Sequence, residues 1–258
     1  MKRSSCFFLI LALALCLSAQ LCAQSGDVRP ELVPQTGHAY PIWKLAFSNN
    51  GKLLASATPL ESAVVLWDVE NERQLRTFNA GAGGGTSFLN GIRSLSLSPD
   101  GRILAAGTDT GVIVWNVADG NELYHFVPNA QGFAANVGVA ALEFSPSSHL
   151  LAAIEGNSIQ IWDINNGNSF RNIPFQELIA GGTLAFSADE HTLAAAIYGA
   201  SQDTSIRLFD LSSGNVQEKK ITGHLSFLGT GGLAYTPEGR LLAVSESEGE
   251  GRKVEGRR

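Results

Sequence analysis

One phrase of thirteen residues recurs five times along the chain. Each copy joins an apolar strand to a polar turn and then to a second apolar run. The copies recur every 42 to 50 residues, a period typical of repeat architectures rather than of a single globular enzyme fold. They are LAFSNNGKLLASA at 45–57, LSLSPDGRILAAG at 95–107, LEFSPSSHLLAAI at 142–154, LAFSADEHTLAAA at 184–196 and LAYTPEGRLLAVS at 233–245.

Each repeat unit predicts four short strands. Alternating apolar residues, such as Ile42, Leu45 and Phe47, indicate a first strand, and the polar turn that follows favours a tight reversal. A nearly continuous apolar run then indicates a second strand that is buried on both faces. A β-branched third strand ends in an aromatic residue followed by Asp or Asn, and a polar turn leads to a fourth strand. The third strands are VVLWDV at 64–69, VIVWNV at 112–117, IQIWDI at 159–164 and IRLFDL at 206–211.

These Trp-Asp pairs, with Gly-His pairs at 37–38 and 223–224, resemble the WD40 repeat family, whose unit is four strands in about 40 to 45 residues. The resemblance covers residues 37–245 and implies an all-β propeller with four full blades and a partial fifth, open or truncated. The expected blades are 37–79, 88–127, 135–174, 180–222 and 223–245. The residues that match the structural signature are His38, Trp67, Asp68, Asp109, Trp115, Trp162, Asp163, Asp203, Phe209, Asp210 and His224.

The chain also departs from the family's pattern. In that family a buried His, Ser or Thr, Asp and Trp are hydrogen-bonded across each blade. The second, third and fourth units lack the Gly-His pair, and Glu61 and Gly156 stand where the family has its Asp. We therefore expect the buried network to be incomplete in most blades, which apolar packing between sheets would then hold together.

The first 23 residues predict a signal peptide, because a basic start precedes a short apolar run and then small and polar residues. Cleavage is expected after Ala23, and a lipid anchor through Cys16 or Cys22 is the weaker reading. All three cysteines lie in this leader. The mature chain is expected to be periplasmic or extracellular and to have no membrane span. Residues 24–36 carry two prolines and predict a linker or an edge strand.

The other end predicts a charged, disordered tail over residues 246–258, where a third strand with its Trp-Asp pair is expected. Propellers close with roughly four to eight blades, so this sequence supplies too few for the family's usual ring. Three interpretations stay open. The sequence is a fragment of a longer propeller, or residues 28–36 complete a five-bladed ring, or partner chains supply the remaining blades.

The sequence contains no pattern that predicts catalysis, a cofactor or a metal. No serine-hydrolase elbow or phosphate loop occurs, and the five histidines have no metal-ligand spacing. The run DINNGN at 163–168 looks like a calcium loop, but the same place in other units also holds a polar turn, so we interpret it as a hairpin. Without the leader's two basic residues, 16 basic residues face 24 acidic ones, which argues against a nucleic-acid partner.

Surface loops remain as the candidate functional feature. The loops between units are long and rich in glycine or alanine, and aromatic residues stand in them or at the corresponding positions of other units. We predict that they bind a protein partner, and that the open ends of the repeat array favour self-association. The chain is thus expected to be an exported interaction scaffold without catalytic activity. The alternatives are an exported propeller-type hydrolase or lactonase, and a non-functional fragment of a longer propeller. The candidate binding residues are Tyr40, Phe88, Phe133 and Phe227.

Overall fold

The computed structural model divides the chain into two units, Met1–Thr36 and Gly37–Arg258. The residues that it describes all lie in the second unit, so the expected signal peptide and linker lie outside them. Five predicted site residues also fall outside the described part of the chain, namely Phe88, Phe133, Asp203, His224 and Phe227. The described residues are 37–81, 91–127, 138–175, 179–199, 204–212, 218–222, 232–236, 238–244 and 254–255.

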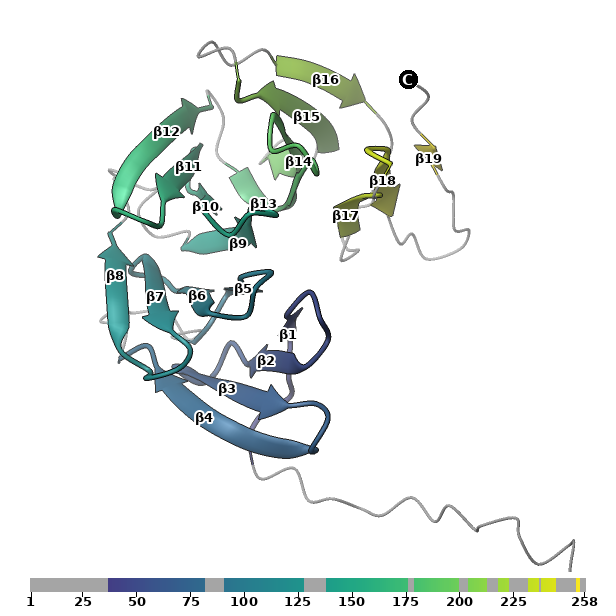
Figure 1. Ribbon diagram of the computed structural model, residues 1–258. Coiled ribbons are helices and arrows are strands. Elements are labelled where there is room, and N and C mark those ends of the chain that lie inside the picture. The colour runs from purple at the N-terminus through teal and green to yellow at the C-terminus, as the bar shows by residue number, and fades with distance from the viewer. Residues whose placement is uncertain are drawn as a thin grey trace, which may run out of the picture. The chain divides into compact units, whose positions relative to one another are not determined.

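Within these residues the chain forms five antiparallel sheets, which follow one another in chain order (Figure 1). Sheet 1 contains β1 (Lys44–Phe47), β2 (Leu53–Ala57), β3 (Ala63–Asp68) and β4 (Arg73–Asn79), and sheet 2 contains β5 (Ser94–Leu97), β6 (Ile103–Gly107), β7 (Val112–Asn116) and β8 (Glu122–Phe126). Sheet 3 contains β9 (Val139–Phe144), β10 (Leu150–Glu155), β11 (Ser158–Asp163) and β12 (Asn168–Pro174). Sheet 4 contains β13 (Ile179–Phe186), β14 (Thr192–Gly199), β15 (Thr204–Asp210) and β16 (Glu218–Thr222), and sheet 5 contains β17 (Gly232–Tyr235), β18 (Leu241–Val244) and β19 (Val254–Glu255).

In the part of the chain that the structure describes, this arrangement confirms an all-β fold with four four-stranded units and a shorter fifth. The described residues contain no helix that is long and apolar enough to cross a membrane. Sheet 5 differs from expectation at one place. Val254 and Glu255, in the segment predicted to be disordered, pair with Ala243 and Leu242 of β18. Backbone pairing depends on the N–H and C=O groups that every residue except proline carries, so a charged sequence can still form a short edge strand.

The recurring phrase forms the same turn between the first two strands of each unit. In sheet 1 the Ser48 hydroxyl donates to Asn50 Oδ1 (2.8 Å) and accepts from Leu53 N (3.0 Å). The turn then requires a left-handed residue, which is a glycine in sheets 1, 2 and 5. In sheets 3 and 4 the position holds Ser148 (φ 66°) and Glu190 (φ 59°) instead, and side chains with a Cβ adopt this conformation at a cost.

The aromatic residues of the Trp-Asp signature occupy matching places in four sheets. Each lies opposite the second residue of the unit's second strand, and all four of these partners are leucines. A register shift immediately precedes the tryptophan in sheets 1, 2 and 3. The four pairs are Trp67–Leu54, Trp115–Leu104, Trp162–Leu151 and Phe209–Leu193.

Successive sheets are held together by apolar clusters, and each cluster draws on two neighbouring sheets. At three of these contacts an aromatic residue at the outer strand of one sheet packs against the signature aromatic of the next. Phe78 meets Trp115 with ring centroids 5.6 Å apart. The other two pairs are Phe126–Trp162 at 4.5 Å and Phe175–Phe209 at 6.0 Å. The expected packing of sheet against sheet is therefore observed.

Candidate protein-interaction site

A hydrogen-bonded chain fixes the segment before β1 onto sheet 1. His38 Nδ1 lies 2.6 Å from Glu61 Oε2, and His38 Nε2 lies 2.9 Å from the Ser56 hydroxyl. Trp67 Nε1 donates to the same hydroxyl (2.7 Å). Because a carboxylate only accepts, Nδ1 of His38 donates to Glu61, and the Ser56 hydroxyl joins the ring to Trp67.

This hydrogen-bond network corrects part of the sequence interpretation. Glu61 was read as a departure that breaks the network, yet its carboxylate takes the place of the family's Asp and completes the network in the first blade. Its second oxygen also accepts from Ala39 N (2.8 Å). Burial alone would raise the pKa of Glu61, but the hydrogen bonds from His38 and Ala39 outweigh it and hold the pKa below its usual value.

Two exposed apolar residues are sequence neighbours of residues in this network. Tyr40 follows Ala39 and is 49% exposed, and Leu60 precedes Glu61 and is 48% exposed. We call these two residues the Tyr40 surface. The segment that enters sheet 2 reaches the same turn, since Gly91 N donates to Pro59 O (3.0 Å). Gly91 therefore lies beside the turn that carries Leu60, while Phe88 lies outside the described residues.

In sheet 2 an Asp stands at the position of Glu61, and it has a different hydrogen-bond partner. Asp109, predicted from the family pattern, accepts a hydrogen bond from Arg93 Nε. Arg93 N also donates to Gly107 O (2.8 Å), as Trp43 N donates to Ala57 O in sheet 1 (3.1 Å). An Arg–Asp ion pair thus stands where this unit lacks a Gly-His pair. Sequence reasoning missed Arg93, although a basic residue just before the repeated phrase was the available signal.

The Asp or Asn after each signature aromatic accepts hydrogen bonds that close a turn. Asp163 Oδ1 accepts from Asn165 N (2.9 Å), and its other oxygen accepts from the Asn166 amide (3.0 Å). Asp68 and Asp210 accept backbone N–H groups in the same way. The interpretation of DINNGN as a hairpin agrees with this geometry. Among the described residues, no three His, Cys, Asp or Glu side chains gather to hold a metal ion.

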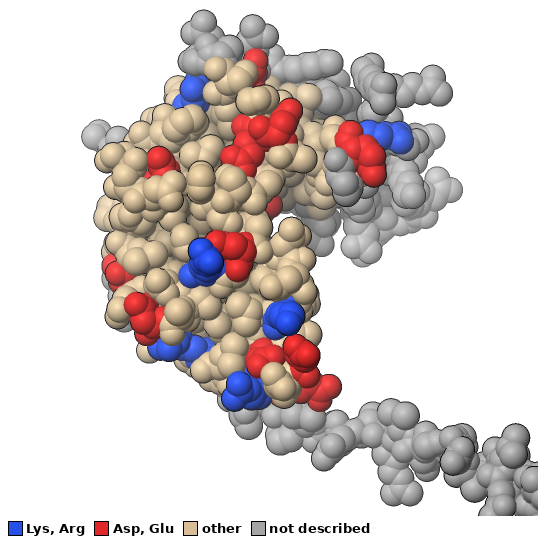
Figure 2. Space-filling view, in the orientation of Figure 1, with Lys and Arg blue, Asp and Glu red and all other residues tan. Residues whose placement is uncertain are grey.

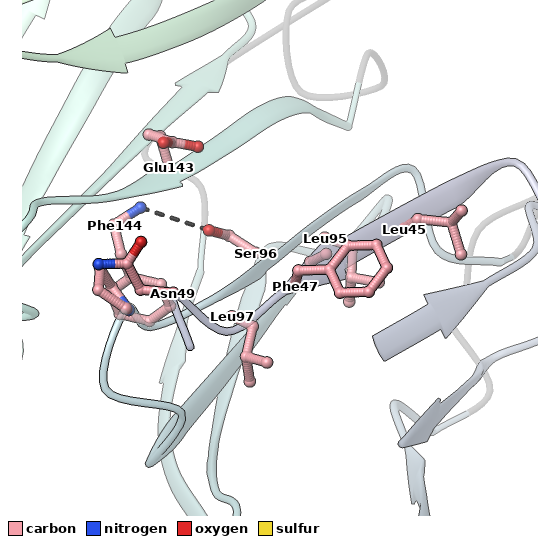
Figure 3. A pocket seen from close by; sticks show the side chains of 10 residues that line it. Leu45, Phe47, Asn49, Leu95, Ser96, Leu97, Glu143 and Phe144 are labelled. Carbon is pink, nitrogen blue, oxygen red and sulfur yellow. Dashed lines mark hydrogen bonds between the residues drawn. The ribbon is translucent and has the colours of Figure 1, made fainter. Parts of the chain in front are cut away.

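A pocket of about 250 Å³ lies between the first strands of sheets 1, 2 and 3 (Figure 3). Leu45, Phe47 and Phe144 give it apolar walls, and Ser96 accepts a hydrogen bond from Phe144 N (3.3 Å). Glu143 is half-buried here, and this burial raises the pKa of its carboxyl to about 7. The sequence did not predict this pocket, because its lining comes from three separate units.

Charged side chains do not form a basic patch on the face that Figure 2 shows. Acidic and basic residues there lie interspersed between broad uncharged areas. Several of the opposite charges are close neighbours, such as Lys52 and Glu70 (3.8 Å) and Arg73 and Asp68 (3.5 Å). The exposed apolar side chains are therefore the more distinctive feature of the described surface.

Comparisons with known proteins agree on the repeat and the fold. The family model for the WD domain, G-beta repeat matches residues 31–68 and 75–116. A chain of the Kuenenia stuttgartiensis hydrazine synthase matches with a TM-score of 0.62 and 16% identity, covering 81% of this chain and 58% of that one. A chain of the mitotic checkpoint complex matches with a TM-score of 0.65 and 20% identity, covering 84% and 64%. This chain thus spans less than two thirds of either protein, and the likeness concerns the fold. No curated protein matches the sequence.

Proposed function

Because the chain is a WD40 repeat protein, we propose that it works as an exported scaffold that binds a protein partner and has no catalytic activity of its own. The WD40 repeats and the propeller-like sheets support a repeat-based interaction domain. The observation that carries the finer proposal is the Tyr40 surface, where exposed apolar residues adjoin a partly buried hydrogen-bond network.

Aromatic side chains on a rigid support suit protein recognition, since they bury much area and lose little conformational entropy. Tyr40 meets this description, because Ala39 beside it is hydrogen-bonded to Glu61 (2.8 Å) and His38 to Ser56 (2.9 Å). Phe88, Phe133 and Phe227 belong to the proposal from the sequence alone. The partner we propose is a protein segment with apolar side chains that fit Tyr40 and Leu60.

The test uses residues 24–258 as bait for proteins of the same exported fraction, followed by affinity measurement with the purified captured partner. Tyr40→Ala combined with Leu60→Ser should weaken binding by tenfold or more, and Phe88→Ala with Phe133→Ala should do the same. Val127→Ala is the control, because Val127 is 71% exposed outside this surface. Unchanged affinity in both double variants, with unchanged circular dichroism, would show that partners bind elsewhere.

Export is a separate part of the proposal and has its own test. The basic start, the apolar run and Ala23 support it. Expression of the full chain followed by N-terminal sequencing should give a mature protein that begins at Gln24, in the periplasm or the medium. Retention of Met1 in the cell interior would contradict export without affecting the interaction surface.

The absence of catalysis is tested by assay rather than by structure. Ester, lactone and glycoside substrates should show no turnover above that of a Glu143→Gln variant, since Glu143 lines the pocket with a pKa near neutrality. Turnover that Glu143→Gln abolishes would replace the scaffold with the hydrolase alternative.

A further inference from the structure

Sheet 1 leaves one apolar face open. Its side chains at alternating positions of the first strand, Trp43, Leu45 and Phe47, are 66%, 58% and 55% exposed, and Val69 after β3 is 40% exposed. We call these four residues the open face of sheet 1. Exposed apolar patches on folded proteins commonly mark contact sites.

The internal repeats show what covers this face elsewhere in the chain. The residues at the positions of Leu45, Phe47 and Val69 in sheets 3 and 4 are all buried in clusters shared with the preceding sheet. The residue types at these positions are nearly the same in every sheet. The side chains of sheet 1 are therefore exposed because no preceding sheet covers them among the described residues. The covered counterparts are Leu142 (7%), Phe144 (3%), Ile164 (5%), Leu184 (4%), Phe186 (6%) and Leu211 (5%).

The signature aromatics lead to the same conclusion. Trp115, Trp162 and Phe209 each pack against an aromatic residue of the preceding sheet. Within the described part of the chain, Trp67 has no aromatic ring against it, and it is only partly buried. A sheet that packs against the open face should therefore also cover part of Trp67.

Sheet 5 carries the complementary side. Its Leu233 is buried against sheet 4, whereas the next residue, Ala234, points to the other side of the strand and is exposed. The residues at the position of Ala234 in sheets 2 and 4 contact the following sheet. Ser96 accepts from Phe144 N (3.3 Å), and Ala185 packs with Leu233. The chain thus holds both halves of a contact that it already makes four times internally.

We propose that the open face of sheet 1 binds the Ala234 side of sheet 5 in a second copy of the chain, in a head-to-tail contact that repeats the packing between successive sheets. Such a heterologous contact either closes a ring or continues to grow. Two copies together carry twice the five sheets that the described residues of one copy form. That number exceeds the roughly four to eight blades of typical closed propellers. Growth to open oligomers is therefore expected as the concentration rises.

The experiment measures the mass of residues 24–258 by light scattering and sedimentation over a wide range of concentration. The wild-type mass should increase with concentration, and Phe47→Asp or Leu45→Asp should return it to that of a monomer. Both side chains are exposed, so circular dichroism should not change. The control Val127→Asp changes an exposed residue outside the face and should associate like the wild type.

Mixing distinguishes head-to-tail from head-to-head contact. Phe47→Asp blocks the open face of sheet 1, and Ala234→Asp blocks the other side of the contact. Each variant alone should be monomeric, and an equimolar mixture should form a dimer that does not grow. A wild type that stays monomeric throughout would overturn the proposal, as would association that Val127→Asp also removes. Self-association of Ala234→Asp alone would overturn the head-to-tail geometry. This variant keeps only the open face of sheet 1, so two copies of it would have to pair face to face.

Discussion

Replacing Trp115 by alanine tests whether packing between sheets stabilises the repeat array. Trp115 is 3% exposed and packs against Phe78 of the preceding sheet. Removing a buried aromatic side chain costs about 3 to 5 kcal/mol of unfolding free energy, of which the ring pair accounts for about 0.5 to 1.5 kcal/mol. For a chain of this size each kcal/mol lowers the melting temperature by about 2 to 4 °C. The expected decrease is therefore about 6 to 20 °C.

The matched control is Trp43→Ala, because Trp43 is 66% exposed and its loss should change the unfolding free energy by less than about 0.5 kcal/mol. Urea unfolding and thermal melts followed by circular dichroism, on dilute monomeric protein, give both values. A double-mutant cycle with Phe78→Leu then isolates the ring contact. Equal destabilisation by Trp115→Ala and Trp43→Ala, or zero coupling to Phe78, would refute the packing argument.

Three further changes test separate features. Glu61→Ala leaves the buried His38 ring without its acceptor and should lower the free energy of unfolding, measured in urea, by about 1 to 3 kcal/mol. The control Glu70→Ala, at an exposed ion pair, should lower it hardly at all. Equal losses in the two variants would contradict the network. Ser148→Gly relieves a left-handed residue (φ 66°) and should stabilise the chain by about 0.5 to 1 kcal/mol, so destabilisation would argue against strain at this turn. Burial raises the pKa of Glu155 to about 7 from 4.5, so the folded state holds the proton more tightly than the unfolded state does. The contribution of Glu155 to stability is therefore full below about pH 4.5. It decreases as the pH rises towards 7, by up to about 3 kcal/mol. Glu155→Gln should reduce this decrease in unfolding measured between pH 4 and 8, and an identical pH profile would exclude Glu155 as its source.

The sequence predicted the strands well, because each unit repeats the same alternation and the same turn. Trp67, Trp115 and Trp162 could be aligned before any coordinates, and they occupy the same register. The His38 network could not be read in the same way. A carboxylate is chemically able to accept from His38 whether it belongs to Asp or Glu, but only the path of the β2–β3 turn decides whether Glu61 reaches the ring.

The candidate site was less predictable than the fold, since a site joins residues from different units. The sequence predicted Tyr40 as a candidate binding residue, but Leu60 gave no signal, because one leucine in a polar turn has no periodic context. The pocket at Glu143 likewise requires three first strands to converge. Arg93 precedes the repeated phrase and could have been noticed there, but its pairing with Asp109 depends on the fold.

Sequence reasoning predicted open ends of the repeat array, but it could not identify the residues that are exposed there. Leu45 and Phe47 are the same residue types as the buried Leu142 and Phe144, so only the neighbouring sheet makes them different. Burying such a side chain completely contributes about 1.5 to 3 kcal/mol, and Trp43, Leu45 and Phe47 are roughly half exposed. Covering them should thus contribute only about 3 to 5 kcal/mol by the same scale, against an association cost of at least about 4 kcal/mol. The proposed contact is therefore weak by itself, which is why its test must follow mass over concentration, and why a tight complex at high dilution would require contacts beyond the open face.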